Sequence, residues 1–556
     1  MASPPLAPPP DFVGEFRTDL PARALYSEGA GALRIVPAAV ALPRSRDDIV
    51  ALVRHAAAEG LTLVPRAGGT GMPGHNVGPG IVVDLRALDR PSRVALAGTA
   101  NIGAAVTCGV VNTVAGHFGM RFAPDPSSAA YCTIGGMVNT NAAGTRSLRC
   151  GSVRRWVRGV ELVTADGEVG WLPRAEARRA NRFPTPAERR QLSERLGAEE
   201  RVAALHPRLG AARDEIAARF PATSKNSSGY ALDAYLASGD ILDLVIGSEG
   251  TLGIVTRAEL QLERVPGAVG TLVVALTDLE AIAPAVEVLR SFDPTAIELL
   301  DRTFLEFAGP AVAPLPLDGV RTLLLVDVEG PDAERVAYTL AQADTASRRF
   351  ASATRVGLDP GERAVLWRIR HAASTALAAL PDARRSLQII EDGCVPVAAL
   401  GRYVAGIAAA AAEVAIPVVM FGHAGDGHLH VNALVDTGLP DLEVRLKRLF
   451  DDVSRLVMDL GGTPSGEHGD GHLRTPLLAR LYGPVVTGLF AAVKHAFDPG
   501  GMFNPGVIVP DARVEMRLKV GSGAPEIPAE VAAALRARER GARWDLPPLN
   551  LLDEPT

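Results

Sequence analysis

The stretch LTLVPRAGGTGMPGHNVGPGIVVDL, residues 61–85, decides the fold of the N-terminal half of the chain. Its glycine spacing, Gly69 to Gly74, formally fits G-x-G-x-x-G, but the dinucleotide-binding fingerprint requires a helix to open at the glycines. Here Pro73, Pro79 and Gly80 lead into a second β-rich run instead. The sequence therefore predicts a strand, a glycine-rich loop and a second strand.

That glycine-rich loop has two interpretations. Its unobstructed backbone N–H groups can form an anion-binding nest around a pyrophosphate, although ordinary glycine-rich surface loops are about as common. Two further clusters of small residues favour the nest: CTIGGMVNTNAAGTRSLRCGSVRRWV, residues 132–157, and IGSEGTLGIVT, residues 246–256. Small residues permit a close approach to a bulky planar ligand, so the three loops together indicate a long cofactor site.

The segments around these loops predict a chain of two domains. PRSRDDIVALVRHAAAEG, residues 43–60, is an amphipathic helix with Ser45 as N-cap, and GVELVTADGEV, residues 159–169, is a hairpin. Strand-helix patterns begin at residues 271 and 321, which indicates an α+β second domain. We predict a Pro-rich disordered leader over 1–30, a first domain over 31–266, a second domain over 267–510 and a tail over 511–556.

Two segments lie apart from this plan. Residues 174–219 carry eleven Arg against seven Asp plus Glu, which favours a solvated helical excursion over a docking patch. In the tail, EIPAEVAAALRARERG predicts one helix, and the ordered part of the chain is expected to end at Val509. The Ala-rich stretch 404–422, interrupted by Glu413 and Pro417, predicts a buried helix and strand instead of a membrane span.

Composition excludes several classes of function. With 22% charged and 47% hydrophobic residues and a net charge of −6, the 556-residue chain is typical of a soluble globular protein and lacks the basic surface of a nucleic-acid binder. Four widely separated cysteines, without a C-x-x-C pair, exclude an iron-sulfur cluster and a cysteine-rich zinc site. The N-terminus has no basic or apolar signal region, so we expect a cytoplasmic protein.

Histidines are concentrated near the C-terminus. Of 11 in the chain, five lie between His423 and His472, where an even spread would place about one. In a strand HLHVNAL, His428, His430 and Asn432 share one face, and the glycines before it can fold His423 back toward that face. SGEHGDGH adds Glu467 and His468. Two imidazoles and a carboxylate suit an open divalent metal site; hydrogen-bonded structural histidines are the alternative.

Six motifs in order resemble the FAD-binding domain of the vanillyl-alcohol oxidase and p-cresol methylhydroxylase (PCMH) flavoprotein superfamily: VPRAGGTGMPG, APDPSS, TIGGMVNTNAAG, GVELVTADGEV, KNSSGYAL and IGSEGTLGIVT. The resemblance implies an α+β protein with a PCMH-type FAD-binding domain. It also implies a set of FAD-binding residues, namely Pro65, Arg66, Ala67, Gly68, Gly69, Thr70, Gly71, Pro124, Asp125, Ser128, Thr133, Gly135, Gly136, Asn141, Gly144, Glu249, Gly253, Ile254, Val255 and Asn504. Members with covalent flavin carry a His where this chain has Thr70, so non-covalent FAD is implied; His75 departs from the Gly usual in relatives.

Motifs in the second half resemble the C-terminal FAD-linked oxidase domain of D-lactate and D-2-hydroxyglutarate dehydrogenases: LWRIRHAAS, EDGCVP, GHAGDGHLHVN, SGEHGDG and FDPGGMFNPG. The resemblance implies that His423, His430 and Glu467 hold a divalent metal, zinc by preference, and that His468 is the base. It further implies that Arg370 clamps the substrate carboxylate, with Ser374 and Asn432 beside it. Relatives commonly have Asn at His428, which leaves open whether His428 joins the ligands.

The resemblance implies an FAD-dependent dehydrogenase that oxidises a D-2-hydroxy acid to the 2-oxo acid. The expected partners are this small acid and a separate electron acceptor: a quinone, a cytochrome, an electron-transfer flavoprotein, an iron-sulfur subunit or oxygen. A homodimer, peripheral attachment to a membrane, and a second substrate clamp at Arg384 and Arg385 are left open. The alternatives are a flavin-carrying electron-transfer subunit of a glycolate or lactate oxidase complex, and a metal-dependent hydrolase.

Overall fold

A computed structural model of the chain describes residues 6–88, 92–95, 97–175, 190–193, 195–309, 315–545 and 547–552. The side chains of Ala373, Ser374 and Leu552 lie outside this description. The predicted substrate residue Ser374 is therefore placed only by its backbone in a helix, and part of the excursion at 174–219 also lies outside the described residues.

The first sheet surrounds the glycine-rich loop, in the order β1-β2-β4-β3. Its elements are β1 (Glu15–Arg17), α1 (Leu20–Leu25), β2 (Ala39–Leu42), α2 (Arg46–Glu59), β3 (Leu63–Arg66), β4 (Ile81–Asp84) and η1 (Leu85–Ala87). Strands β3 and β4 are parallel neighbours, and the predicted loop connects them. Helix α2 begins at the predicted cap Ser45, whose side chain accepts from the Asp48 backbone N–H, and packs Ile49, Leu52 and Val53 against the sheet.

The second sheet has the order β5-β6-β10-β8-β9 and is antiparallel. Its strands and the small pair beside it are β5 (Ser92–Ala95), β6 (Thr99–Gly103), β7 (Met120–Arg121), β8 (Val157–Val163), β9 (Val169–Pro173), β10 (Ile254–Gln261) and β11 (Glu263–Arg264). Its helices are α3 (Cys108–Gly116), α4 (Ile134–Thr140), α5 (Ser147–Cys150), η2 (Val153–Arg155), α8 (Gly197–Ala211), α9 (Arg213–Arg219), α10 (Leu232–Ser238) and α11 (Leu242–Val245). The hairpin predicted around Asp166-Gly167 is β8 and β9.

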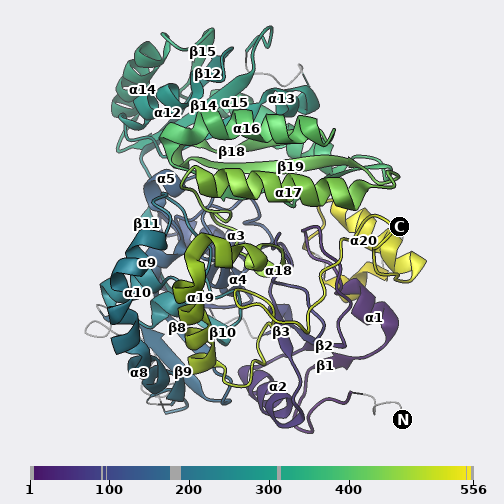
Figure 1. Cartoon of the computed structure of the whole chain (residues 1–556). Helices are drawn as coiled ribbons and strands as arrows, with labels where there is room; N and C mark the ends of the chain where they lie inside the picture. The colour runs from purple at the N-terminus through teal and green to yellow at the C-terminus, as the bar shows by residue number, and fades with distance from the viewer. Residues whose placement is uncertain are drawn as a thin grey trace.

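The third sheet forms the upper part of the molecule in Figure 1 and runs β15-β12-β14-β13-β18-β19-β16, with β17 on β19. Its strands are β12 (Ala268–Leu276), β13 (Ala296–Asp301), β14 (Thr322–Gly330), β15 (Ala353–Gly357), β16 (Arg384–Leu387), β17 (Gly393–Cys394), β18 (Val418–His423) and β19 (His428–Asp436). Its helices are α12 (Ile282–Arg290), α13 (Arg302–Ala308), α14 (Ala333–Ser347), α15 (Pro360–Ala378), η4 (Val397–Ala399), α16 (Leu400–Glu413), η5 (Ala424–Asp426) and α17 (Leu442–Asp459).

Alternation along these strands separates the two faces of the third sheet. Leu429, Val431 and Ala433 pack with α12, α14, α16 and α17, whereas Val419, Phe421 and Leu434 pack with α13 and α15. The histidines of β19 share the second face with Leu434, which confirms the predicted alternation. The helix and strand predicted over 404–422 are α16 and β18.

The chain then returns to the first domain. The last elements are α18 (Gly471–Arg474), η6 (Thr475–Leu477), α19 (Leu478–Phe497), α20 (Ala529–Arg540) and η7 (Pro548–Leu552). Although the sequence assigned α19 to the second domain, its apolar residues pack in the core of the second sheet, beside α8 and α9. Among the described residues, Gly471–Phe497 is the one segment long and apolar enough to span a membrane, and Gly483 kinks it.

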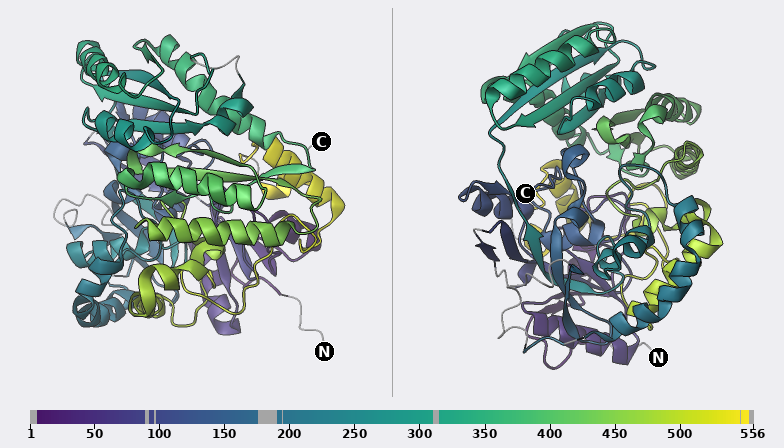
Figure 2. Two further views of the ribbon diagram at one scale, coloured as in Figure 1. Left: turned by 45° about the horizontal axis from the view of Figure 1, so that its top comes forward. Right: turned by 90° about the vertical axis from the view of Figure 1, so that its left-hand side faces the viewer.

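Both ends of the chain differ from the sequence prediction. Within the predicted leader, β1 pairs with β2, and α1 buries Ala24 and Leu25 against α20 and the first sheet. The ordered part does not end at Val509, because the predicted tail helix exists as α20 and buries Val531 in the same cluster. The two segments cover each other's apolar faces, a pairing that neither segment reveals alone. Figure 2 shows the tail returning toward the N-terminal elements.

Candidate functional site

The three glycine-rich loops line one cavity of about 290 Å³. Its wall includes the loop after β3, the segment Pro126 to Ala143 and the turn Glu249-Gly250. Glu467 and His468, from the second half of the chain, complete the wall. The cavity that the glycines form is therefore continuous with the histidine cluster.

This cavity exists because the loops pack without side chains. A Cβ on Gly68 would lie 2.5 Å from the Tyr131 carbonyl oxygen, and one on Gly135 would lie 2.7 Å from the Ala104 Cβ. Gly69 has φ of +77°, a conformation that other residues rarely adopt. Glycine backbone and small side chains thus make up much of the cavity wall, which lets a bulky cofactor approach the main chain closely.

The predicted FAD-binding residues divide into two groups. Those lining the cavity are Pro65, Ala67, Gly68, Gly69, Thr70, Gly71, Ser128, Thr133, Gly135, Gly136 and Glu249. Those that do not line it are Arg66, Pro124, Asp125, Asn141, Gly144, Gly253, Ile254, Val255 and Asn504. Arg66 is fully buried, and its guanidinium donates to the backbone carbonyls of Tyr26, Glu28 and Asn76. Its side chain supports the loop from behind instead of reaching into the cavity.

Glu249 connects the cofactor loops to the second half of the chain. Its carboxylate accepts from the backbone N–H groups of Asp470 and Gly471, both at 2.8 Å, and lies 3.1 Å from His75 Nδ1. The Asn504 amide donates to the backbone carbonyls of His75 and Glu249. His75, the departure from relatives, thus has a carboxylate partner at the cavity wall.

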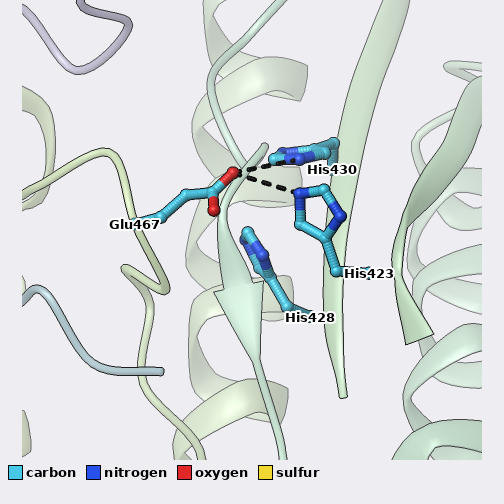
Figure 3. A group of neighbouring side chains, drawn as sticks. All are labelled: His423, His428, His430 and Glu467. Carbon is cyan, nitrogen blue, oxygen red and sulfur yellow. Dashed lines mark hydrogen bonds and ion pairs between the residues drawn. The ribbon is translucent and has the colours of Figure 1, made fainter. Parts of the chain in front are cut away.

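The histidine cluster lies where β18 and β19 meet, on the sheet face described above (Figure 3). Glu467 Oε1 is 3.3 Å from His423 Nε2 and 3.5 Å from His430 Nε2. Among the described residues, His423, His428, His430 and Glu467 each offer a ligand atom within 4.8 Å of the others. Two imidazole nitrogens and one carboxylate oxygen therefore converge on one point, as an open divalent metal site requires.

The remaining nitrogens of these two histidines are oriented by hydrogen bonds. His423 Nδ1 lies 2.5 Å from Glu298 Oε1, and His430 Nδ1 donates to the Glu391 carbonyl oxygen at 3.0 Å. Such partners fix the ring and direct the lone pair of Nε2 toward a metal. Burial lowers the pKa of His423, but Glu298 outweighs it and raises the pKa to about 8. The donor set and its supporting shell fit a metal ion.

His428 is held differently from its neighbours. Its Nε2 is 2.9 Å from Asp392 Oδ1, and its Nδ1 is 3.3 Å from Lys225 Nζ. Burial first, and then the Lys225 ammonium, lower the pKa of His428 to about 4. With Nε2–H donated to Asp392 and Nδ1 accepting from Lys225, a neutral His428 has no lone pair left for a metal. We therefore exclude His428 from the proposed ligand set.

Lys225 is the first residue of the motif KNSSGYAL, and the sequence predicted no role for it in the site. Its buried ammonium lies 2.7 Å from Glu467 Oε2, and the Gly144 backbone N–H donates to the same oxygen at 3.0 Å. Burial alone would raise the pKa of Glu467, but Lys225 and His423 hold it well below its ordinary value. Lys225 and Gly144 thus occupy Oε2 and leave Oε1 facing the histidines. The only sequence signal for Lys225 was its place in the motif KNSSGYAL.

His468 is the most exposed member of the cluster, with 28% of its side chain accessible. Its Nδ1 is 2.6 Å from Glu391 Oε2, and Arg474 binds Glu391 Oε1 at 2.7 Å. Burial lowers the pKa of His468, but Glu391 and Asp392 outweigh it and raise the pKa to about 10. The carboxylate Glu391 therefore orients the ring and stabilises a protonated imidazole, and Nε2 points toward Glu467, 3.7 Å from Oε1. The fifth histidine, His472, is separate: its Nε2 lies 2.9 Å from the Val77 carbonyl oxygen.

Of the predicted substrate residues, Arg370 is linked to His423 through Glu298. Arg370, on α15, binds Glu298 through Nε at 3.3 Å, and its guanidinium lies 4.6 Å from the centroid of the Phe421 ring. Asn432 is buried on β19, on the face of His428 and His430. Arg384 and Arg385 do not join this group, because they face the other end of β19 and Arg385 pairs with Glu539 of the tail.

Each half of the chain matches a known protein family. Residues 37–172 match the family described as FAD binding domain, and residues 265–508 match FAD linked oxidases, C-terminal domain. Among solved structures, p-cresol methylhydroxylase with substrate bound aligns with a TM-score of 0.63 at 13% identity, over 89% of this chain and 94% of that chain. At that identity, the likeness shows the fold.

Curated relatives cover most of the sequence. Glycolate oxidase subunit GlcD of Bacillus subtilis is 28% identical over 88% of this chain and 93% of that protein. D-lactate dehydrogenase of Archaeoglobus fulgidus is 28% identical over 84% of this chain and 91% of that protein. D-2-hydroxyglutarate dehydrogenase of Escherichia coli is 28% identical over 90% of this chain, which spans about half (51%) of that longer protein.

Proposed function

Because the chain belongs to the FAD-linked oxidases, we propose that it is an FAD-dependent dehydrogenase that oxidises a D-2-hydroxy acid, of the lactate or 2-hydroxyglutarate class, to the 2-oxo acid. One observation carries the proposal: a single cavity has the glycine-rich loops on one side and Glu467 and His468 on the other. A planar cofactor in this cavity would lie beside the cluster that binds the substrate.

The two groups that the chain would bind supply what its side chains lack. Bound FAD would supply a hydride acceptor for the C2 hydrogen of the acid, and a bound divalent ion, zinc by preference, would supply positive charge beside the hydroxyl oxygen. His423, His430 and Glu467 would hold the ion. The glycine-rich loops would hold FAD without a covalent bond, because Thr70 occupies the position at which covalent relatives carry a histidine.

The chain's own residues would bind the acid and move its proton. In its neutral form, which a divalent cation at His423, His430 and Glu467 would favour, His468 would take the hydroxyl proton at Nε2, because Glu391 occupies Nδ1 and stabilises the imidazolium that forms. Arg370 would bind the carboxylate through its terminal nitrogens, because Glu298 occupies Nε, and two parallel contacts would fix the acid's orientation. Asn432 and Ser374 are proposed to lie beside this carboxylate.

Electrons would leave through a separate acceptor: a quinone, a cytochrome, an electron-transfer flavoprotein, an iron-sulfur subunit or oxygen. An electron-transfer subunit without chemistry of its own is the alternative, and the cluster argues against it because such a subunit would have no use for residues proposed to bind an acid and take its proton. A cytoplasmic location, a homodimer and peripheral contact with a membrane stay predictions.

The visible spectrum of the purified protein tests the proposal. Under anaerobic conditions, a yellow protein should be bleached by a D-2-hydroxy acid and not by its L-isomer. His468→Ala should slow this flavin reduction by roughly 100- to 10,000-fold, the usual contribution of a general base, with FAD still bound. Reduction at the wild-type rate would remove His468 from the mechanism, and a colourless protein that cannot be reconstituted with FAD would refute the function.

A further inference from the structure

The cofactor cavity has one wall residue from an unexpected part of the chain. Trp544 lines it together with the glycine-rich loops. It lies beyond residue 508, where the match to the FAD-linked oxidase family ends. The tail therefore contributes an indole ring to a wall that is otherwise made mainly of glycines and small side chains, with Tyr131 as a further aromatic residue.

The tail helix α20, which precedes Trp544, is fixed to both halves of the molecule. Val531 and Leu535 are buried in one cluster with Leu25 and the first sheet. On its other side, Arg536 and Arg540 each bind Asp382 at 2.8 Å, next to β16 of the third sheet. This two-sided attachment is visible in Figure 1, where α20 lies between α1 and the end of β19. Trp544 thus follows an anchored helix.

The turn after α20 orients the indole. The Arg538 guanidinium lies 4.4 Å from the centroid of the Trp544 ring, and Arg538 Nε donates to the Arg543 carbonyl oxygen at 3.1 Å. The Arg543 backbone N–H donates back to the Arg538 carbonyl at 3.0 Å. A cation against an indole ring is a favourable contact that fixes the ring's orientation. The half-buried ring is therefore held at the cavity.

The position of Trp544 identifies the half of the cofactor that it would contact. Glu467 and His468 mark the end at which the acid and the flavin must meet. Trp544 is associated with the elements around the start of the glycine-rich loop: its partner Arg538 is close enough to Asp84 and Arg66 for both to affect the pKa of Arg538, and Leu85, which follows Asp84, lines the cavity. The glycine-rich loop that suits a pyrophosphate begins directly after Arg66. Beyond a pyrophosphate on this loop, the AMP half of FAD remains.

We propose that Trp544 is a cofactor-binding residue whose indole stacks on the adenine of FAD, and that α20 fixes it in place. The proposal rests on the proposed use of FAD and adds a contact from the tail. Base–aromatic stacking is a strong and common way to bind a nucleotide base. Trp544 should not contribute to the binding of the flavin half of FAD.

Flavin titration of the FAD-depleted full-length chain tests this assignment. Dissociation constants are measured for FAD and for FMN, which has no adenylate. Trp544→Ala should raise the FAD constant by roughly 5- to 150-fold, the range of stacking contributions, and leave the FMN constant within about twofold. Trp544→Phe, which keeps an aromatic face, should restore most of the FAD affinity. Glu530→Gln, at an exposed position at the start of the same helix and away from its contacts with Asp382, is the matched control and should change neither constant.

Two results would overturn the proposal: an unchanged FAD constant in Trp544→Ala, or equal losses of FAD and FMN. If Trp544→Ala lowers the melting temperature of the flavin-free chain, Trp544→Leu fills the same space without a π-face and should show the same selective loss of FAD. A wild-type chain that binds neither flavin would refute the proposed function itself, which is a different outcome from a chain that binds FAD without using Trp544.

Discussion

The cofactor cavity and the histidine cluster adjoin each other but are built by opposite means. The cavity is formed by what its residues lack: at Gly68 and Gly135 a single added carbon would collide with the facing loop. The cluster is formed by buried charges, each matched by a partner, as with Lys225 and Glu467 or Glu298 and His423. The comparison teaches that added atoms should damage the first region, whereas removed atoms should damage the second.

The two regions also differ in how much stability a substitution costs. Overpacking a loop costs about 1–3 kcal/mol, and the loop can shift to relieve it. Removing one partner of a buried ion pair leaves an uncompensated charge, which costs about 3–5 kcal/mol. Substitutions in the cofactor cavity should therefore reduce FAD binding alone, and substitutions in the histidine cluster should reduce metal binding alone.

The largest expected effect is at His423. His423→Ala removes one metal ligand and the hydrogen-bond partner of Glu298, so metal content should fall from one ion per chain toward zero, and turnover should fall by roughly 1,000-fold or more. The visible spectrum should still show bound FAD. Metal analysis and anaerobic flavin reduction check this, with the exposed His117→Ala as control. Retained metal in His423→Ala would contradict the ligand assignment.

The converse test adds an atom to the cavity. Gly68→Ala places a Cβ 2.5 Å from the Tyr131 carbonyl oxygen, so the two cofactor loops must move apart. We expect about 1–3 kcal/mol less stability and a lower FAD occupancy, with metal content unchanged. Gly210→Ala, where a Cβ meets nothing within 4 Å, is the control. Loss of metal together with FAD would show that the two regions are not independent.

A third prediction concerns a buried carboxylate without a cationic partner. Asp301 and Glu298 lie on the same strand, but burial raises the pKa of Asp301 to about 7, whereas His423 and Arg370 overcome burial and lower that of Glu298 to about 2. The folded state thus retains a proton on Asp301 that the unfolded chain releases near pH 4, so stability should fall as pH rises from about 4 to 7. Asp301→Asn, which still caps α13, should gain on the order of 2 kcal/mol relative to wild type between pH 5 and 8. Urea unfolding of both proteins at pH 5 and pH 8 measures the difference in their free energies of unfolding. A difference that does not change with pH would contradict the prediction.

The smallest effect on metal content is expected at His428. His428→Asn breaks at least one hydrogen bond, to Asp392 or Lys225, and should cost about 1–2 kcal/mol of stability. Metal content should stay at one ion per chain, because both ring nitrogens already have partners. Metal loss equal to that of His423→Ala would make His428 a ligand.

The fold was predicted where local sequence carries the information. Ser45 and the apolar spacing of α2, the Asp-Gly hairpin and the alternation of β19 each act within a few residues. The structure of the two chain ends was not predicted, because α1 and α20 are apolar only on the faces that they turn toward each other and the first sheet. An isolated segment of this kind reads as a leader or a tail.

The sequence by itself determined that loops of glycine follow strands and that His428, His430 and Asn432 share one face of a strand, because backbone freedom and residue spacing are local properties. The grouping of His423, His430 and Glu467 was implied by the family resemblance. Only the tertiary structure decided which atoms face each other. It set Glu298 against His423, gave Lys225 to Glu467 and His428, and brought Trp544 to the cofactor cavity. The reason is physical: a buried charge needs a partner within a few ångströms, and packing of distant segments supplies it from any part of the chain.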